Sequence, residues 1–227
     1  MSMASFLRRT LPATTVGAYL MAVPERPGPA PLLVGFHGYG QNAEACLSEL
    51  LRIPGASSLR VVAIEALHRF YDLRHRDVVG SWMTRVDREQ CIADNLRYVT
   101  KVLSEVDRET AGGSGVVYAG FSQGACMAYR AAAHGPRPAQ GLIALGGDLP
   151  PDVAEDAAVA LPPLLIGRGS RDTWYTEDKL AADMDRLRAR GGEVEVVGFD
   201  GGHEWTDAFR EKAGAFLRRV LAPQSGA

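Results

Sequence analysis

Ser122 stands between two glycines in the stretch YAGFSQGACM, with Gly120 two residues before it and Gly124 two residues after it. A G-x-S-x-G pattern is typical of a nucleophilic serine on a sharp strand-to-helix turn, where side chains at the flanking positions would collide with the strand and the helix. The alternative is a serine that merely caps a helix. We favour the nucleophile, because an apolar strand-like run precedes the serine and a helix-like run follows it.

A nucleophilic serine needs a general base, and His203 is the best placed of the five histidines. It lies in the glycine-rich stretch DGGHEW, after the last strand-like run and before the last helical pattern. A loop there can hold an imidazole over the strand ends. His37 precedes GYG in the chain, and we expect it to shape that loop through backbone hydrogen bonds.

An acid must orient the base, and three aspartates compete for that role. Asp172 follows the strand-like run PLLIGRG, Asp148 follows the preceding one, and Asp200 lies three residues before His203. We favour Asp172 over Asp148, and we expect Asp200 to be a turn residue. The order Ser122, Asp172, His203 is then the order of the catalytic triad in α/β hydrolases.

The same chemistry requires two backbone donors for the oxyanion of a tetrahedral intermediate. The N–H of Gln123 follows the serine directly and supplies one donor. The stretch HGYG follows the strand-like run PLLVGF, and its Tyr39 N–H is the natural second donor. The glycines on either side of Tyr39 would let the backbone approach the oxyanion closely.

Strand-like and helix-like segments alternate along the chain, and this predicts a mostly parallel central sheet with helices on both faces. Apolar residues with helical spacing mark 88–107, 177–190 and a C-terminal helix. The stretch 67–87 reads as a long irregular loop that could line the site. The expected strands lie within 15–23, 31–36, 59–67, 115–120, 141–147, 163–169 and 193–199.

Composition excludes several classes of protein. The 227 residues have a formal net charge of −2, with no basic run interleaved with aromatics, so no nucleic-acid partner is expected. No apolar run is long enough to span a bilayer. Three scattered cysteines suit a reducing compartment, and we expect a cytoplasmic protein. We expect residues 1–227 to form one domain with a flexible tail at 223–227, and a homodimer remains among the open oligomeric states.

Together the motifs FHGYGQN, GFSQGACMA, RGSRDTWYT and GGHEW resemble those of the phospholipase/carboxylesterase family of α/β hydrolases, which includes the acyl-protein thioesterase-like serine esterases. The resemblance runs from about residue 15 to about residue 222. It implies an α/β-hydrolase fold without a large cap domain and a triad of Ser122, Asp172 and His203. It also implies an oxyanion hole at Tyr39 and Gln123, and neither a metal nor a cofactor.

The substrate expected from these features is a small ester. Four bulky residues are candidates for the pocket wall, although apolar residues such as the first two are more often core residues, here anchoring the long loop: Trp82, Met83, Trp174 and Tyr175. Trp174 and Tyr175 stand where the family usually carries small residues or proline, which favours short- to medium-chain acyl groups. The alternatives are a thioesterase or lysophospholipase-like hydrolase of longer chains, a peptidase or acyltransferase with the same triad, and a non-catalytic binding protein.

Overall fold

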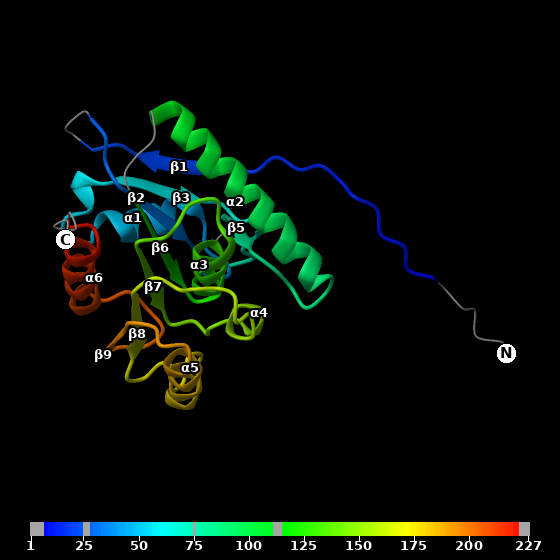
Figure 1. Ribbon diagram of the computed structural model, residues 1–227. Coiled ribbons are helices and arrows are strands. Elements are labelled where there is room, and N and C mark those ends of the chain that lie inside the picture. The colour runs from blue at the N-terminus through cyan, green and yellow to red at the C-terminus, as the bar shows by residue number, and fades with distance from the viewer. Residues whose placement is uncertain (1–6, 25–27, 75, 111–114, 223–227) are drawn as a thin grey trace.

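The computed structural model describes residues 7–24, 28–74, 76–110 and 115–222, and within them a seven-stranded sheet forms the centre of the protein (Figure 1). The expected flexible tail at 223–227 lies outside the described residues. In spatial order the strands are β1 (Tyr19–Ala22), β3 (Arg60–Ile64), β2 (Leu32–Phe36), β6 (Val116–Phe121), β7 (Gly141–Leu145), β8 (Leu164–Gly169) and β9 (Val194–Phe199).

The sheet is mostly parallel, as the sequence pattern predicts. Only β1 runs antiparallel, at the edge beside β3, and the other six strands pair in parallel. Every residue of β2, β3, β6 and β7 is buried, which explains their continuous apolar runs. The strands lie within the predicted ranges, except that β6 continues one residue further, to Phe121.

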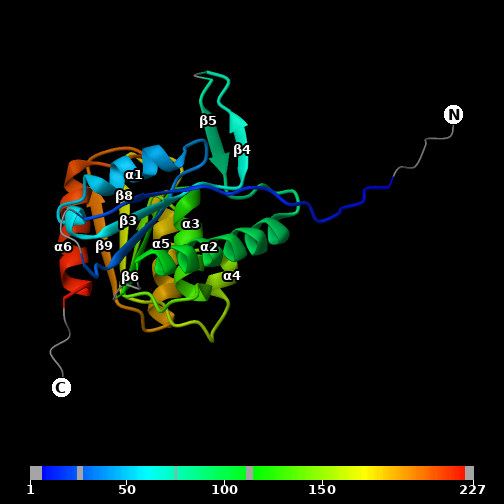
Figure 2. The same ribbon diagram turned by 90° about the horizontal axis from the view of Figure 1, so that it is seen from above.

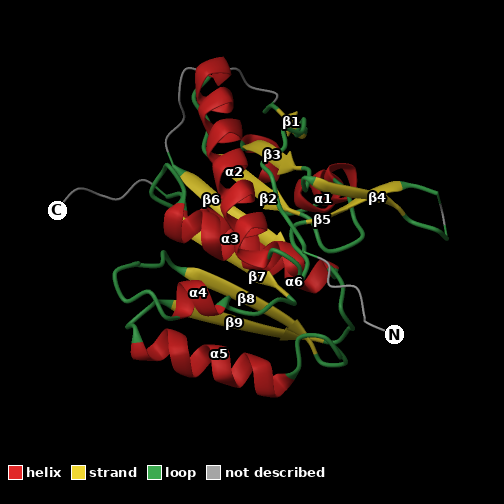
Figure 3. Ribbon diagram, turned by 90° about the vertical axis from the view of Figure 1, so that its right-hand side faces the viewer, coloured by secondary structure: helices red, strands yellow, loops and turns green. Residues whose placement is uncertain are grey.

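Helices cover both faces of the sheet (Figure 3). One apolar cluster packs the side chains of one sheet face against α2 (Arg88–Thr110), α3 (Gln123–His134), α4 (Pro151–Ala154) and α5 (Glu177–Ala189). A second cluster packs the other face against α1 (Ala43–Leu51), the short 3₁₀ turn at Ala56–Ser58 and α6 (Asp207–Val220). None of the helices in the described ranges is long and apolar enough to cross a membrane.

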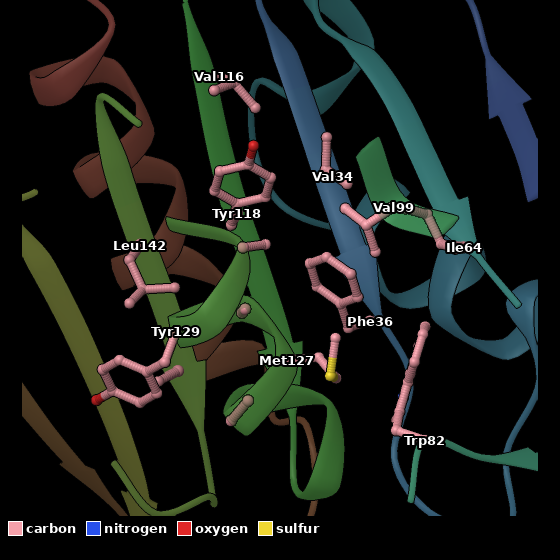
Figure 4. Packing of buried hydrophobic residues seen from close by; sticks show 14 of the residues in the cluster. Val34, Phe36, Ile64, Trp82, Val99, Val116, Tyr118, Met127, Tyr129 and Leu142 are labelled. Atoms are coloured by element: carbon pink, nitrogen blue, oxygen red, sulfur yellow. The ribbon is translucent and has the colours of Figure 1, made fainter. Parts of the chain in front are cut away.

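Aromatic residues fill the core between the sheet and α3 (Figure 4). Phe36 and Tyr118 come from neighbouring strands, with ring centroids 6.2 Å apart. Trp82 contacts Phe36 edge-on at 5.4 Å and is fully buried. Its indole N–H donates to the carbonyl of His37 at 2.8 Å, so the polar atom of this large side chain is satisfied. Trp82 therefore attaches the end of the 67–87 stretch to the core.

The stretch 67–87, expected to be irregular, contains an antiparallel hairpin of β4 (His68–Tyr71) and β5 (Val78–Ser81). The hairpin projects from the body of the protein (Figure 2). Two backbone hydrogen bonds attach it to the loop after β2: Gly40 N–H donates to Gly80 O at 3.0 Å, and Gly80 N–H donates to Gln41 O at 2.7 Å. Apolar and polar residues do not alternate clearly in these short strands, so no strand is evident from the sequence pattern. Among the described residues there is no large cap domain.

Candidate active site

Ser122 lies on a sharp turn between β6 and α3, with φ 55° and ψ −121°, a backbone conformation that is strained for any residue but glycine. A Cβ on Gly120 would lie 2.2 Å from the carbonyl oxygen of Gly124, and a Cβ on Gly124 would lie 2.1 Å from that of Phe36. Both flanking glycines are therefore required by close backbone contacts. The serine side chain makes no capping hydrogen bond to α3, so the helix-cap interpretation has no support.

A chain of two hydrogen bonds links Ser122, His203 and Asp172. The Oγ of Ser122 lies 2.8 Å from Nε2 of His203, and Nδ1 of His203 lies 2.8 Å from Oδ2 of Asp172. The serine follows β6, the aspartate follows β8 and the histidine follows β9, so all three lie at the carboxyl ends of parallel strands. An imidazole held this way can accept the serine proton while the carboxylate stabilises its cationic form.

The loop after β8 holds the carboxylate of Asp172 in place. Its Oδ1 accepts hydrogen bonds from the backbone N–H of Trp174 at 2.8 Å and of Tyr175 at 2.9 Å. The side chain is almost fully buried. These two bonds use one carboxylate oxygen and leave the other for His203.

The two competing aspartates have other partners. The Oδ2 of Asp148 lies 3.4 Å from Nζ of Lys179, and Asp200 forms an exposed ion pair with Arg171. His203 makes its carboxylate contact with Asp172 alone among the described residues. The geometry therefore favours Asp172 as the partner of the imidazole.

Close packing orients the ring of His203. Its centroid lies 4.8 Å from the ring of Phe121 and 6.5 Å from that of Trp174. Gly146 also lies against the ring: it has φ 62°, and a Cβ there would lie 3.1 Å from the imidazole. A larger residue at position 146 would therefore be strained and would press against the histidine.

The loop after β2 presents the N–H of Tyr39 without an acceptor among the described residues. Its neighbours are occupied: Gly38 N–H donates to the side chain of Gln41 at 2.8 Å, and Gly40 N–H donates to Gly80. The ring of Tyr39 is largely exposed and packs against Phe70 of the hairpin at 5.4 Å.

His37 shapes this loop, as the sequence suggests. Its Nδ1 lies 2.7 Å from Gly38 O, and its Nε2 accepts the N–H of Ala66 at 3.1 Å, which assigns the proton to Nδ1. Burial lowers the pKa of His37, so the neutral ring is favoured. The buried ring therefore links two backbone segments, the loop after β2 and the segment after β3, through its two nitrogens.

The side chain of Gln123 connects the serine turn to the segment after β5, a role that the sequence gives no sign of. Its Oε1 accepts the N–H of Trp82 at 2.8 Å and the hydroxyl of Ser81 at 3.3 Å, and its Nε2 donates to Met83 O at 2.8 Å. Gln123 thus has its backbone N–H next to Ser122, while its side chain holds the backbone of residues 81–83 in place.

A cavity of about 450 Å³ opens beside Ser122. Of the four expected pocket residues, Met83 and Trp174 line it, whereas Trp82 and Tyr175 do not: both are fully buried behind it. Sequence reasoning missed four lining residues, because they come from loops and helix starts with no motif of their own: Thr84, Arg85, Arg88 and Lys179. Cys126 of the serine motif and Asp148, weighed above as the acid, also line the cavity. No group of three or more His, Cys, Asp or Glu side chains in the described residues could hold a metal ion.

Tyr175 supports the loop that carries Asp172. Its hydroxyl donates to Oδ2 of Asp183 at 3.1 Å, and the same oxygen accepts the N–H of Leu149 at 2.9 Å. Burial raises the pKa of Asp183 above its ordinary value, and these two hydrogen bonds offset only part of that effect. The hydroxyl of Tyr175 therefore attaches the loop after β8 to α5 through Asp183.

Comparison of the fold with solved structures finds close matches over nearly the whole chain. Esterase PE8 has a TM-score of 0.68 and 24% identity, with 90% of this chain and 99% of that chain covered. Zea mays acyl-protein thioesterase 2 has a TM-score of 0.67 and 20% identity, with 91% of this chain and 100% of that chain covered. Bacillus cereus carboxylesterase has a TM-score of 0.70 and 17% identity, with 90% of this chain and 95% of that chain covered. At these identities the likeness establishes the α/β-hydrolase fold.

No curated protein matches the amino-acid sequence. The model of the Phospholipase/Carboxylesterase family matches residues 21–221, a range that contains the serine turn, the loop after β2 and both loops that meet at His203. The chain therefore belongs to the phospholipase/carboxylesterase family of α/β hydrolases.

Proposed function

We propose that this protein is a serine carboxylesterase that hydrolyses short- to medium-chain carboxylic esters through an acyl-enzyme on Ser122. The observation that carries the proposal is the continuous pair of hydrogen bonds from Ser122 through His203 to the buried Asp172. Membership of a hydrolase family supports the same chemistry.

In the proposed mechanism, Nε2 of His203 takes the proton of Ser122 as Oγ attacks the ester carbonyl carbon. Asp172 accepts a hydrogen bond from the Nδ1–H group of His203. This bond keeps the imidazole in the productive tautomer and stabilises the imidazolium. The imidazolium then protonates the leaving alcohol. Water, activated by the same imidazole, cleaves the acyl-enzyme and releases the carboxylic acid.

The negative charge of the tetrahedral intermediate needs donors that are in place beforehand. We assign this role to the backbone N–H groups of Gln123 and Tyr39. The first lies at the N-terminus of α3, where the helix dipole favours negative charge. The second has no acceptor among the described residues. Each donor of this kind contributes roughly 3 kcal/mol to transition-state stability.

Substrate size is proposed from the cavity. Its volume of about 450 Å³ is at the small end of the range for ligand pockets. Met83 and Trp174 supply apolar surface for an acyl or alcohol group, while Trp82 and Tyr175 support the wall from behind.

One observation favours the alternative of longer acyl chains. A groove of about 580 Å³ adjoins the cavity and shares Arg88, Cys126 and Asp148 with it. Its far wall is apolar and includes Ile92, Leu96 and Pro150. A series of nitrophenyl esters from acetate to palmitate, together with matched thioesters, separates the two: a clear optimum at long chains would contradict the short-chain proposal.

The Ser122→Ala variant tests the proposal directly. It should lose hydrolysis of 4-nitrophenyl acetate and covalent labelling by a fluorophosphonate, with an unchanged midpoint of thermal unfolding. Ser104→Ala, at an exposed serine on α2, is the matched control and should behave as the wild type. Wild-type turnover in Ser122→Ala would exclude the mechanism.

A further inference from the structure

The cavity beside Ser122 has a cationic wall. Among the described residues that line it, three carry positive charge, Arg85, Arg88 and Lys179, and one carries negative charge, Asp148. The cavity thus has a formal surplus of two positive charges, whereas the chain as a whole has a net charge of −2. The surplus is local to the surface that a substrate would contact.

The two arginines account for this surplus. Lys179 is engaged, since its Nζ donates to Trp174 O at 2.7 Å and lies 3.4 Å from Asp148. Neither Arg85 nor Arg88 forms a hydrogen bond or an ion pair with any residue in the described parts of the chain. Both side chains are exposed, so their guanidinium groups are accessible to a ligand in the cavity.

Two acidic residues near Arg85 and Arg88 have other partners. Asp87 forms an ion pair with Arg8. Asp152, which lines the adjoining groove together with Arg88, accepts two hydrogen bonds from the buried Arg130, at 2.6 and 2.7 Å. These two carboxylates therefore bind other arginines directly, although Arg88 also attracts Asp152 at longer range and Glu89 lines the same groove.

Arg88 also occupies a position where local stability disfavours a cation. It is the first residue of α2, and the N-terminus of a helix carries partial positive charge. A basic residue in the first turn is therefore unfavourable, an effect that Glu89 offsets in part. Departures from local preference of this kind occur where a residue serves a ligand.

We propose that the site prefers ester substrates that carry an anionic group, a carboxylate or a phosphate, bound by Arg85 and Arg88. A guanidinium group binds either anion through two parallel hydrogen bonds, which gives both attraction and orientation. This preference rests on the function proposed above, and it specifies the substrate class of the same site: the ester carbonyl lies at Ser122 and the anion lies at the mouth of the cavity, between α2 and the loop that precedes it.

The test uses esters matched in length and leaving group. Mono-4-nitrophenyl glutarate carries a carboxylate at the acyl end, 4-nitrophenyl pentanoate is its neutral counterpart, and 4-nitrophenyl 3-phosphonopropanoate carries a phosphonate. The wild type should have a higher kcat/KM for at least one anionic ester than for the neutral one. The two anionic esters distinguish a carboxylate from a phosphate preference.

Substitutions then locate the preference. Arg85→Gln and Arg88→Gln should each lower the ratio of anionic to neutral kcat/KM by up to about fivefold, as expected for an exposed ion pair, and the double variant should lower it further. The ratio should also fall as sodium chloride is raised to 0.5 M. Arg218→Gln, which removes the same charge from an exposed position on α6 outside the cavity, should leave the ratio unchanged.

Failure of this inference is distinct from failure of the proposed function. If the wild type hydrolyses the neutral ester equally well or better, or if the double variant keeps the wild-type ratio, the anion preference is refuted and the esterase function stands. If no ester is hydrolysed, calorimetric titration of mono-4-nitrophenyl glutarate into Ser122→Ala decides. The anion site is supported if the glutarate ester binds more tightly than 4-nitrophenyl pentanoate and if Arg85→Gln and Arg88→Gln abolish that difference. Equal binding of the two esters refutes it.

Discussion

Nε2 of His203 lies 2.8 Å from Oγ of Ser122, although the two residues are 81 positions apart in the chain. The contact depends on two turns at the same edge of the sheet, one after β6 and one after β9. A second contact of 2.8 Å, from His203 to Asp172, orients the ring.

Replacement of Asp172 should affect catalysis far more than stability. In Asp172→Asn the amide cannot stabilise an imidazolium, so kcat for 4-nitrophenyl acetate should fall by about 10³–10⁴. Asp200→Asn is the matched control, because Asp200 is exposed and pairs with Arg171; it should keep wild-type kcat. A large loss in Asp200→Asn and a small loss in Asp172→Asn would reverse the assignment of the acid.

Introduction of a side chain at the serine turn should destabilise the protein. In Gly124→Ala the new Cβ would lie 2.1 Å from Phe36 O, and backbone cannot move aside cheaply. Urea unfolding should show a loss of about 2–4 kcal/mol. Gly198→Ala, on an exposed position of β9 with no atom within 4 Å, should change stability by less than about 0.5 kcal/mol. Equal stability of the two variants would contradict the steric argument.

Truncation of Gln123 should weaken the wall of the site while its backbone N–H remains. Gln123→Ala leaves Trp82 N–H without its partner and removes one of the two hydrogen bonds to Met83 O, the other coming from Ser81, which should cost about 2 kcal/mol in unfolding free energy and lower kcat/KM about tenfold or more. Gln123→Glu keeps the acceptor but loses the donor, so it should lie between Gln123→Ala and wild type. Fluorophosphonate labelling of Ser122 should persist in both. Wild-type stability and activity in Gln123→Ala would show that these hydrogen bonds do not support the site.

The buried carboxylate of Asp183 should make stability depend on pH. Burial raises its pKa above the ordinary value of 3.8, so the folded protein binds this proton more tightly than the unfolded chain does. The contribution of this group to stability therefore falls as pH rises from 3.8 through the raised pKa. Asp183→Asn removes the titration and keeps an oxygen that can accept from Leu149 N–H.

The measurement is the difference in unfolding free energy between Asp183→Asn and wild type, followed from pH 3.8 upwards. The difference should grow in favour of the variant and then level off above the raised pKa. Asp185→Asn, on the exposed face of the same helix, should show no such trend. A difference that stays constant or shrinks with pH would contradict the assigned pKa direction.

The elements of the fold could be predicted because their signals are local. Buried parallel strands appear as short apolar runs, and amphipathic helices repeat apolar residues at three- and four-residue spacing. The sequence patterns did not single out α1, α4 or the β4–β5 hairpin. In the hairpin, the four residues of β4 are all exposed and carry no apolar alternation. Its strands form because β5 is attached to the loop after β2 through Gly80 and Gln41, and that contact is not readable along the chain.

By itself, the sequence determined which residue types the candidate site contains: a serine between two glycines, a histidine and an aspartate in loops after later strands, and a glycine-flanked Tyr39. The tertiary structure decided which groups meet. In the structure, His203 contacts Asp172 and not Asp148. The side chains of Trp82 and Tyr175 are buried in the core, and those of Arg85 and Arg88 line the cavity. The reason is physical: residue type and backbone constraint are local properties, whereas side-chain direction and contacts between distant loops depend on strand order and packing.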